Sequence, residues 1–337
     1  MNNTTMKNEK TTHRLIALLF VMVLAAARLT ACTSPAPTAT PLPAAATRVP
    51  PTATPILPTA TLIPPTATPI PPTATATLPA VTPEPSGSAP SALSITYTCN
   101  DGFIISASGK KVMVDALFQE TYCGCQSSTE EAAALEAAQP PFDGVDLILV
   151  SHSHEDHFTP QIVGTYLQNN TKAELIAMES VVSELQQQFA GFDQVQERVR
   201  SVQLEDGQSV QMTVQGVDLE VISAPGEVPN LGFLIQIGGF TLFHTGDAGS
   251  DPEMVALFRS YHLADKHIDL AFVPWWYLGD EWYHPLVEKG IQAHNYVPMH
   301  LAGDDAALVF KFVATYYPQA ILFHEELQTW TFAPPQR

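Results

Sequence analysis

Residues 145–157 read Val145-Asp146-Leu147-Ile148-Leu149-Val150-Ser151-His152-Ser153-His154-Glu155-Asp156-His157. The first half is an apolar run with the length of a buried strand. The second half places three histidines and two acidic residues directly after it. The histidine cluster therefore follows the C-terminal end of a strand, which is where active sites of layered α/β folds often lie.

The spacing His152-x-His154-x-Asp156-His157 is the most specific signal in the chain. Chains of this composition would contain it by chance roughly five times in ten thousand. Imidazole and carboxylate groups are good ligands for Zn²⁺ and similar ions. On a tight loop, the first histidine pair can bind one metal while Asp156 and His157 turn toward a second.

This stretch resembles the signature of the metallo-β-lactamase superfamily, and the resemblance extends over about residues 94–325. Asp115 matches the early aspartate that braces the metal loop. Asp247 in Gly246-Asp247 matches the carboxylate that bridges two metals, and His300 matches the late histidine at a strand end. The resemblance implies one or two Zn²⁺ ions, with manganese or iron as alternatives. His244 is expected to hold a metal ligand in place by a hydrogen bond.

One position departs from the family pattern. The family supplies a third histidine to the first metal about twenty residues before the Gly-Asp segment, but Pro225 stands there, and no histidine occurs between His157 and His244. Three interpretations stay open. Glu227 replaces the missing ligand, or one metal binds to Asp156, His157, Asp247 and His300, or the protein has lost activity.

The N-terminal residues 1–31 are predicted to be a lipoprotein signal peptide. Lys7, Lys10 and Arg14 precede 13 consecutive apolar residues at positions 15–27, which suit a signal sequence better than a transmembrane helix. Cys32 follows Leu29-Thr30-Ala31, which resembles a bacterial lipobox. We therefore expect lipidation of Cys32 and a protein anchored at the extracytoplasmic face of the cell membrane.

Residues 32–92 are predicted to be a disordered linker. They are rich in Pro, Thr and Ala and repeat Pro-Thr-Ala-Thr, a composition typical of extended polyproline segments. Residues 93–337 then form the folded domain. The first 92 residues contain five basic and two acidic residues, so 10 basic and 32 acidic residues remain for the domain. Such an acidic surface disfavours nucleic-acid binding.

Three cysteines remain besides Cys32, namely Cys99, Cys123 and Cys125. An odd number in an oxidising compartment favours one disulfide and one free thiol. The prediction is a disulfide between Cys99 and either Cys123 or Cys125, with metal binding by the Cys-x-Cys pair as an alternative.

The pattern of apolar residues in the domain predicts an α/β fold with two successive series of strands, each followed by helices. The predicted strands include Ser94–Thr98, Lys111–Asp115, Val145–Val150, Phe240–His244 and, as the last one, Ala320–Phe323. Together with the family resemblance, this predicts a four-layer αββα sandwich after the linker.

The expected activity is hydrolysis of a small ester, lactone, amide or phosphoester by a metal-activated water, with Asp156 orienting the attacking water. Two other classes of function compete with it. One is a binding or sensory lipoprotein that has lost turnover, and the other is a redox or structural role for Cys123-Gly124-Cys125. Trp275-Trp276-Tyr277 is expected beside the substrate groove. The sequence leaves the oligomeric state open.

Overall fold

The computed structural model describes residues 91–118, 128–301 and 306–334. The predicted signal peptide, Cys32 and nearly all of the linker lie outside these residues, as do Cys123 and Cys125. Cys99 forms a disulfide, as predicted. No helix in the described part of the chain is long and apolar enough to span a membrane.

The first sheet has seven strands in the order β13-β1-β2-β3-β4-β5-β6. Strands β3 to β6 run parallel to one another, whereas β1, β2 and β13 join through antiparallel pairs. The strands span β1 Leu93–Cys99, β2 Gly102–Ala107, β3 Lys110–Val114, β4 Leu147–Val150, β5 Glu174–Met178, β6 Val199–Val202 and β13 Thr329–Phe332.

The second sheet has six strands in the order β12-β11-β10-β9-β8-β7. Strands β10, β11 and β12 are parallel, and the others pair antiparallel. The strands span β7 Ser209–Val214, β8 Val217–Ser223, β9 Leu231–Ile237, β10 Phe240–His244, β11 Leu270–Pro274 and β12 Asn295–Met299.

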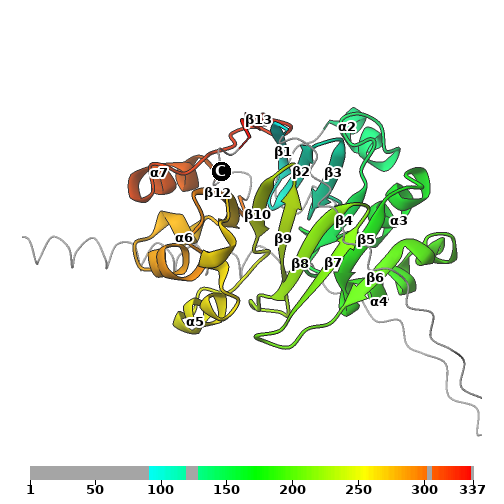
Figure 1. The fold of residues 1–337 in the computed structure, drawn as a ribbon. Coiled ribbons are helices and arrows are strands. Elements are labelled where there is room, and N and C mark those ends of the chain that lie inside the picture. The colour runs from blue at the N-terminus through cyan, green and yellow to red at the C-terminus, as the bar shows by residue number, and fades with distance from the viewer. Residues whose placement is uncertain (1–90, 119–127, 302–305, 335–337) are drawn as a thin grey trace, which may run out of the picture. The chain divides into compact units, whose positions relative to one another are not determined.

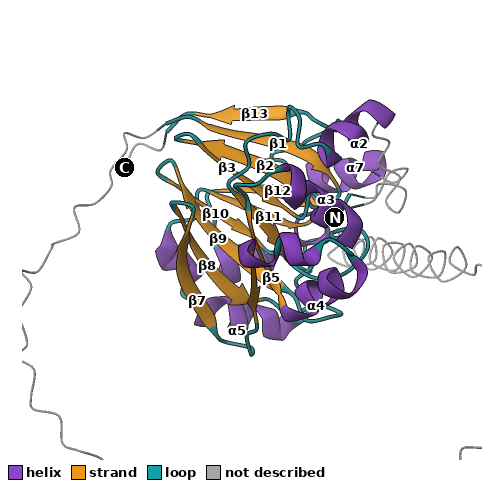
Figure 2. Ribbon diagram, turned by 90° about the vertical axis from the view of Figure 1, so that its right-hand side faces the viewer, coloured by secondary structure: helices purple, strands orange, loops and turns teal. Residues whose placement is uncertain are grey.

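The two sheets pack face to face with helices on both outer sides (Figures 1 and 2). The helices beside the first sheet are α2 Thr129–Glu136, α3 Pro160–Asn169 and α4 Glu179–Gln188. Those beside the second sheet are α5 Pro252–Ser260, α6 Trp276–Gly279, the π-helical η5 Leu286–Ile291 and α7 Ala306–Tyr316. This arrangement is the predicted αββα sandwich.

Strand β4 shows why the layers form. All four of its residues are buried, but they alternate between two cores. Leu147 and Leu149 pack between the sheets, whereas Ile148 and Val150 pack under the helices α3 and α4. A strand that is covered on both faces reads as a continuous apolar run, which agrees with the buried strand that the sequence predicts at Val145–Val150.

The predicted closing strand Ala320–Phe323 was wrong. That segment makes one backbone hydrogen bond to β12, from the Ile321 N–H to the Tyr296 carbonyl, and forms no ladder. The last strand is instead β13, which pairs with β1 from Leu93 opposite Phe332 to Thr96 opposite Thr329. The sequence pattern also did not predict helix α3.

Candidate metal centre

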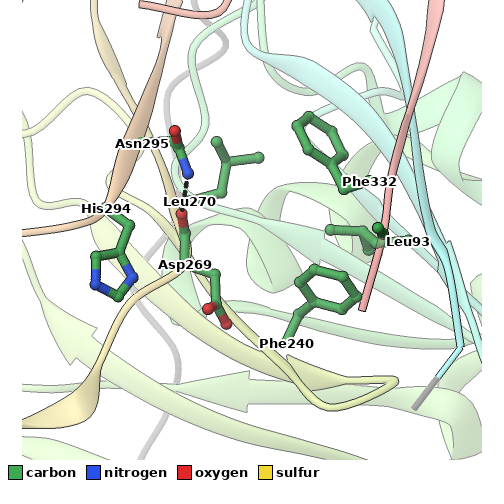
Figure 3. Close-up of a pocket in the computed structure, with 8 residues that line it drawn as sticks. Leu93, Phe240, Asp269, Leu270, His294, Asn295 and Phe332 are labelled. Carbon is green, nitrogen blue, oxygen red and sulfur yellow. Dashed lines mark hydrogen bonds between the residues drawn. The ribbon is translucent and has the colours of Figure 1, made fainter. Parts of the chain in front are cut away.

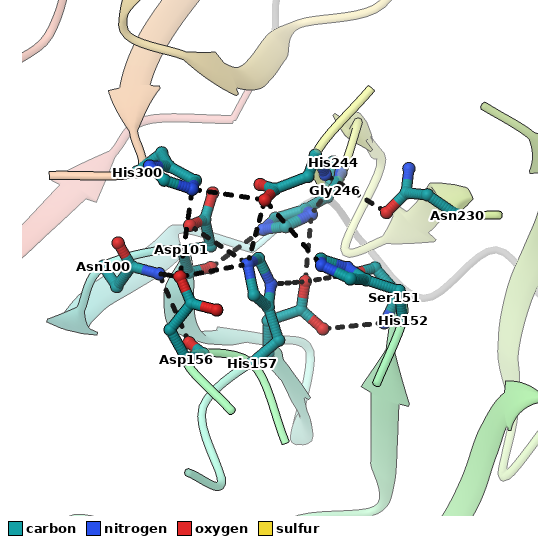
Figure 4. Close-up of polar contacts among 12 residues, drawn as sticks. Asn100, Asp101, Ser151, His152, Asp156, His157, Asn230, His244, Gly246 and His300 are labelled. Carbon is teal, nitrogen blue, oxygen red and sulfur yellow. Dashed lines mark hydrogen bonds and ion pairs between the residues drawn. The ribbon is translucent and has the colours of Figure 1, made fainter. Parts of the chain in front are cut away.

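The strand ends of both sheets bring the predicted site residues together. Asp115 follows β3, the histidine cluster follows β4, Asp247 follows β10 and His300 follows β12. Strands β3 and β4 are parallel neighbours, and so are the strands from β10 to β12. Their carboxyl ends therefore meet at one edge of the sandwich (Figure 4).

Two groups of side chains in the described part of the chain are close enough to hold a metal ion. The first group contains Asp101, His157, Asp247 and His300, and we call it the Asp101 group. The second contains His152, His154 and Asp247, and we call it the His152 group. Within each group one ligand atom per residue lies within 4.8 Å of all the others. Asp247 belongs to both groups.

The spacing of the donor atoms suits a metal ion. Donors about 2.1 Å from a tetrahedral ion are about 3.4 Å from one another. Nε2 of His157 lies 3.4 Å from Oδ2 of Asp247 and 3.6 Å from Oδ2 of Asp101. Nε2 of His300 lies 3.2 Å from the same Asp247 oxygen, and Nε2 of His152 lies 3.8 Å from it. This oxygen therefore faces three imidazoles.

Several of these buried atoms have no hydrogen-bond partner among the described residues. They are both carboxylate oxygens of Asp101, Oδ1 of Asp247, Nε2 of His152, Nε2 of His157 and Nδ1 of His300. Buried polar atoms without a partner are rare and costly, because they lose their hydrogen bonds to water. A bound cation would satisfy these atoms, so the residues present suit the metal that the sequence predicted.

Asp115 fixes the orientation of two candidate ligands. Its carboxylate accepts hydrogen bonds from Nδ1 of His157 at 3.1 Å, from the Ser151 N–H at 2.8 Å and from the Ser151 hydroxyl at 2.7 Å. The Ser151 oxygen in turn accepts from Nδ1 of His152 at 2.9 Å. Both imidazoles are held at Nδ1, which leaves each Nε2 to face the site.

The buried acidic and imidazole groups of the centre shift one another's pKa values. Burial alone would raise the pKa of Asp247, but His157 and His300 together hold it well below its usual range. Burial likewise opposes the charge on His300, yet Asp247 raises the pKa of His300 to about 9. Burial, followed by the charge of Asp247, raises the pKa of Asp101 well above its usual value. Protons thus balance the negative charge where a cation would sit.

The backbone around the centre adopts conformations that ordinary residues rarely occupy. Asn100, Asp115 and His300 have φ values of 51°, 44° and 61°. Such left-handed residues carry a local energetic cost and cluster at functional sites. The His300 N–H donates to the Asn100 carbonyl at 3.3 Å, which joins the loop before β2 to the end of β12.

Asn230 holds the turn that carries Asp247. Its Nδ2 donates to the carbonyls of Ala224 at 2.7 Å and Thr245 at 2.9 Å, and its Oδ1 accepts from the Asp247 N–H at 3.1 Å. This asparagine connects the segment after β8 with the segment after β10. The sequence interpretation missed it, because a single asparagine before a strand is common.

Asp156 and Glu227 lie in neither group. Oδ2 of Asp156 is 3.8 Å from Nε2 of both His157 and His300, and it accepts a hydrogen bond from Nδ2 of Asn100 at 3.2 Å. Glu227 is exposed. Pro225, at the position of the absent histidine, contacts the Asp247 turn through its carbonyl, which accepts from the Gly249 N–H at 2.9 Å.

Asp101 is the main residue that the sequence interpretation missed. It lies in the Cys99-Asn100-Asp101-Gly102 turn between β1 and β2, where Asn, Asp and Gly are ordinary turn residues. A signal did exist, because β2 pairs antiparallel with β3 and places Phe103 opposite Val114. The turn before β2 must then lie beside Asp115, at the same edge as the histidine cluster.

Trp276 borders the centre on the side of His300. The two rings have centroids 5.2 Å apart and meet edge to face at 68°. An apolar hollow of about 290 Å³ lies elsewhere, at the start of β1 and of β10 to β12, and its lining includes Leu93, Phe240 and Phe332 (Figure 3). It contains none of the candidate ligands.

The matching family model is described as the beta-lactamase superfamily domain, and it covers residues 110–324. The chain belongs to this superfamily. It is similar to a UPF0173 metal-dependent hydrolase of Pyrococcus furiosus, with 24% identity over 183 residues, 54% of this chain and 72% of the relative. A UPF0173 metal-dependent hydrolase of Staphylococcus saprophyticus is 29% identical over 179 residues, 50% of this chain and 66% of the relative.

Among solved structures, this chain is similar to Igni18, a metallo hydrolase of Ignicoccus hospitalis. The TM-score is 0.49 at 17% identity, over 72% of this chain and 99% of the other.

Proposed function

We propose that this chain is a metal-dependent hydrolase that cleaves a small ester, lactone, amide or phosphoester. The observation that carries the proposal is the convergence of buried imidazole and carboxylate atoms that have no hydrogen-bond partner among the described residues. The names of the curated relatives support it. Zn²⁺ is the proposed metal because imidazole and carboxylate ligands suit it, and manganese or iron would also fit this donor set.

The residues of the centre would have different roles in the reaction. The Asp101 and His152 groups would hold the metal, which when bound lowers the pKa of a water and polarises the scissile group. Asp156 lies at the edge of the donors and is fixed by Asn100, so its carboxylate would orient the attacking water and accept its proton. Trp276 would give the substrate an apolar wall beside His300.

The proposal is tested on the full chain, purified without chelators, by metal analysis and by hydrolysis of a chromogenic panel of the four bond types. The double variant His152→Ala/His154→Ala should bind less metal than the wild type and lose activity. A wild-type protein that binds no transition metal would refute the proposal. Bound metal without turnover on any substrate would favour the binding or sensory role that the Pro225 position suggests.

The location is a separate part of the proposal. We propose that lipidation of Cys32 anchors the enzyme at the extracytoplasmic face of the cell membrane and that residues 32–92 form the spacer. Labelling of cells with a fatty-acid analogue should mark the wild type but not a Cys32→Ser variant. Release of the variant into the soluble extracytoplasmic fraction is the expected result.

A further inference from the structure

The two candidate metal groups differ in donor number and charge. The Asp101 group has two imidazoles and two carboxylates, whereas the His152 group has two imidazoles and shares the carboxylate of Asp247. A divalent cation in the Asp101 group would be neutralised by its two carboxylates. A second cation in the His152 group would add uncompensated positive charge close to the first, which opposes its binding.

Asp101 has the surroundings expected of a ligand. Its side chain is fully buried, and neither carboxylate oxygen has a hydrogen-bond partner among the described residues. Its Oδ2 faces Nε2 of His157 at 3.6 Å. A buried carboxyl group without hydrogen-bond partners costs stability, and a bound cation would remove that cost. The neighbouring Asp156 carboxylate differs, because Asn100 already donates to it.

The backbone holds Asp101 in place independently of its side chain. The Asp101 carbonyl accepts a hydrogen bond from Nε2 of His244 at 2.9 Å. The adjacent Asn100 pairs with Leu301 in an isolated β-bridge. The carboxylate is therefore preorganised toward His157 and His300, which reduces the entropy cost of metal binding.

We propose that Asp101 is a metal ligand and that the Asp101 group binds the first, tight cation, while the His152 group binds a second cation more weakly. This inference rests on the proposed function, since it requires a metal centre. The sequence left open whether one or two ions bind, and this inference gives the two groups an order of filling. It also assigns a ligand role to a turn residue outside the His152–His157 motif.

The test is a titration of the metal-free full chain with cobalt(II), followed by calorimetry and visible absorption. The wild type should bind two equivalents in separate steps. Asp101→Asn, which keeps the size of the side chain, should weaken the first step at least about tenfold. His154→Ala should remove the second step and leave the first intact. Asp193→Asn, at an exposed carboxylate, is the matched control and should change neither step.

Thermal melting separates a ligand from a structural residue. In the metal-free state, Asp101→Asn should melt within about 3 °C of the wild type or above it, because it replaces a buried carboxyl group whose oxygens have no hydrogen-bond partner among the described residues. Cobalt should then stabilise the variant less than the wild type. An Asp101→Asn protein with an unchanged first step would overturn the inference while the proposed function stands. No cobalt binding to the wild type would overturn both.

Discussion

Nε2 of His244 donates a hydrogen bond to the backbone carbonyl of Asp101 at 2.9 Å, across 143 residues of sequence. The Nδ1 atom of the same ring accepts a hydrogen bond from the Gly246 N–H at 3.1 Å. Since an N–H can only donate, Nδ1 carries no proton, and the proton must be on Nε2. Both ring nitrogens are therefore used within the protein, and burial lowers the pKa of His244. His244 connects the Asp101 turn with the Asp247 turn.

Replacing His244 by Ala should leave the Asp101 carbonyl and the Gly246 N–H buried without partners. Each lost partner costs about 1–3 kcal/mol, so we expect the free energy of unfolding to fall by roughly 2–6 kcal/mol. Metal affinity should fall by about 10–100-fold, because both turns loosen. Urea unfolding and cobalt titration measure the two effects. His262→Asn, at an exposed histidine, is the control, and an equal loss in it would contradict the assignment.

Asp115→Asn should weaken metal binding by about 10–100-fold, because an amide cannot accept all three hydrogen bonds that now orient His157 and Ser151. Asparagine tolerates the left-handed backbone at this position, where φ is 44°. Asp146→Asn is the matched control. Asp146 also accepts a backbone hydrogen bond through its carboxylate, from the Lys111 N–H near the start of strand β3, whereas Asp115 follows the end of that strand. Equal metal affinities of the two variants would argue against the bracing role of Asp115.

Gly246→Ala should destabilise the protein more than Gly109→Ala. Both glycines have positive φ, at 54° and 73°. Alanine in this backbone conformation should therefore destabilise the fold by a similar amount, about 1–2 kcal/mol, at either site. A Cβ at Gly246 would lie 2.3 Å from Oδ1 of Asn230 and 2.7 Å from Cβ of Ser151, whereas Gly109 has open space. We expect a total loss of about 3 kcal/mol or more at Gly246. Equal melting temperatures of the two variants would contradict this.

The stability of the metal-free protein should depend on pH through His300. Although burial lowers its pKa, Asp247 raises it to about 9, above the unfolded value of about 6.5. The protonated form therefore stabilises the fold fully below about pH 6.5, and this contribution is lost as the pH rises to about 9. The melting temperature of metal-free protein should fall across this window. His300→Gln should flatten the curve.

The metal-loaded protein should behave differently across the same window. Metal binding requires an unprotonated imidazole, so the affinity of the centre should rise as His300 loses its proton. The stabilisation by a fixed excess of Zn²⁺ should therefore increase between about pH 6.5 and 9. Parallel pH profiles for the metal-free and metal-loaded proteins would count against His300 as a ligand.

The local pattern of the sequence was enough for the central strand and the position of the histidine cluster. The apolar run 147–150 requires cover on both faces, and three histidines with Asp156 directly after it had no ordinary structural explanation. The Gly246-Asp247 turn and His300 were recognised by their resemblance to the superfamily pattern, and both follow apolar strands. These features are short-range, so the order of the residues carries them.

Asp101, Asn230 and the pairing of β13 with β1 depend on contacts between distant segments. Asp101 reads as a turn residue, and only the β2–β3 register and the bond to His244 place its carboxylate beside His157. The pairing of Ile95 with Trp330 likewise joins the two ends of the domain. Periodicity in a sequence predicts that a strand exists, but the partner of the strand is set by burial of the complete sandwich, which local pattern does not encode.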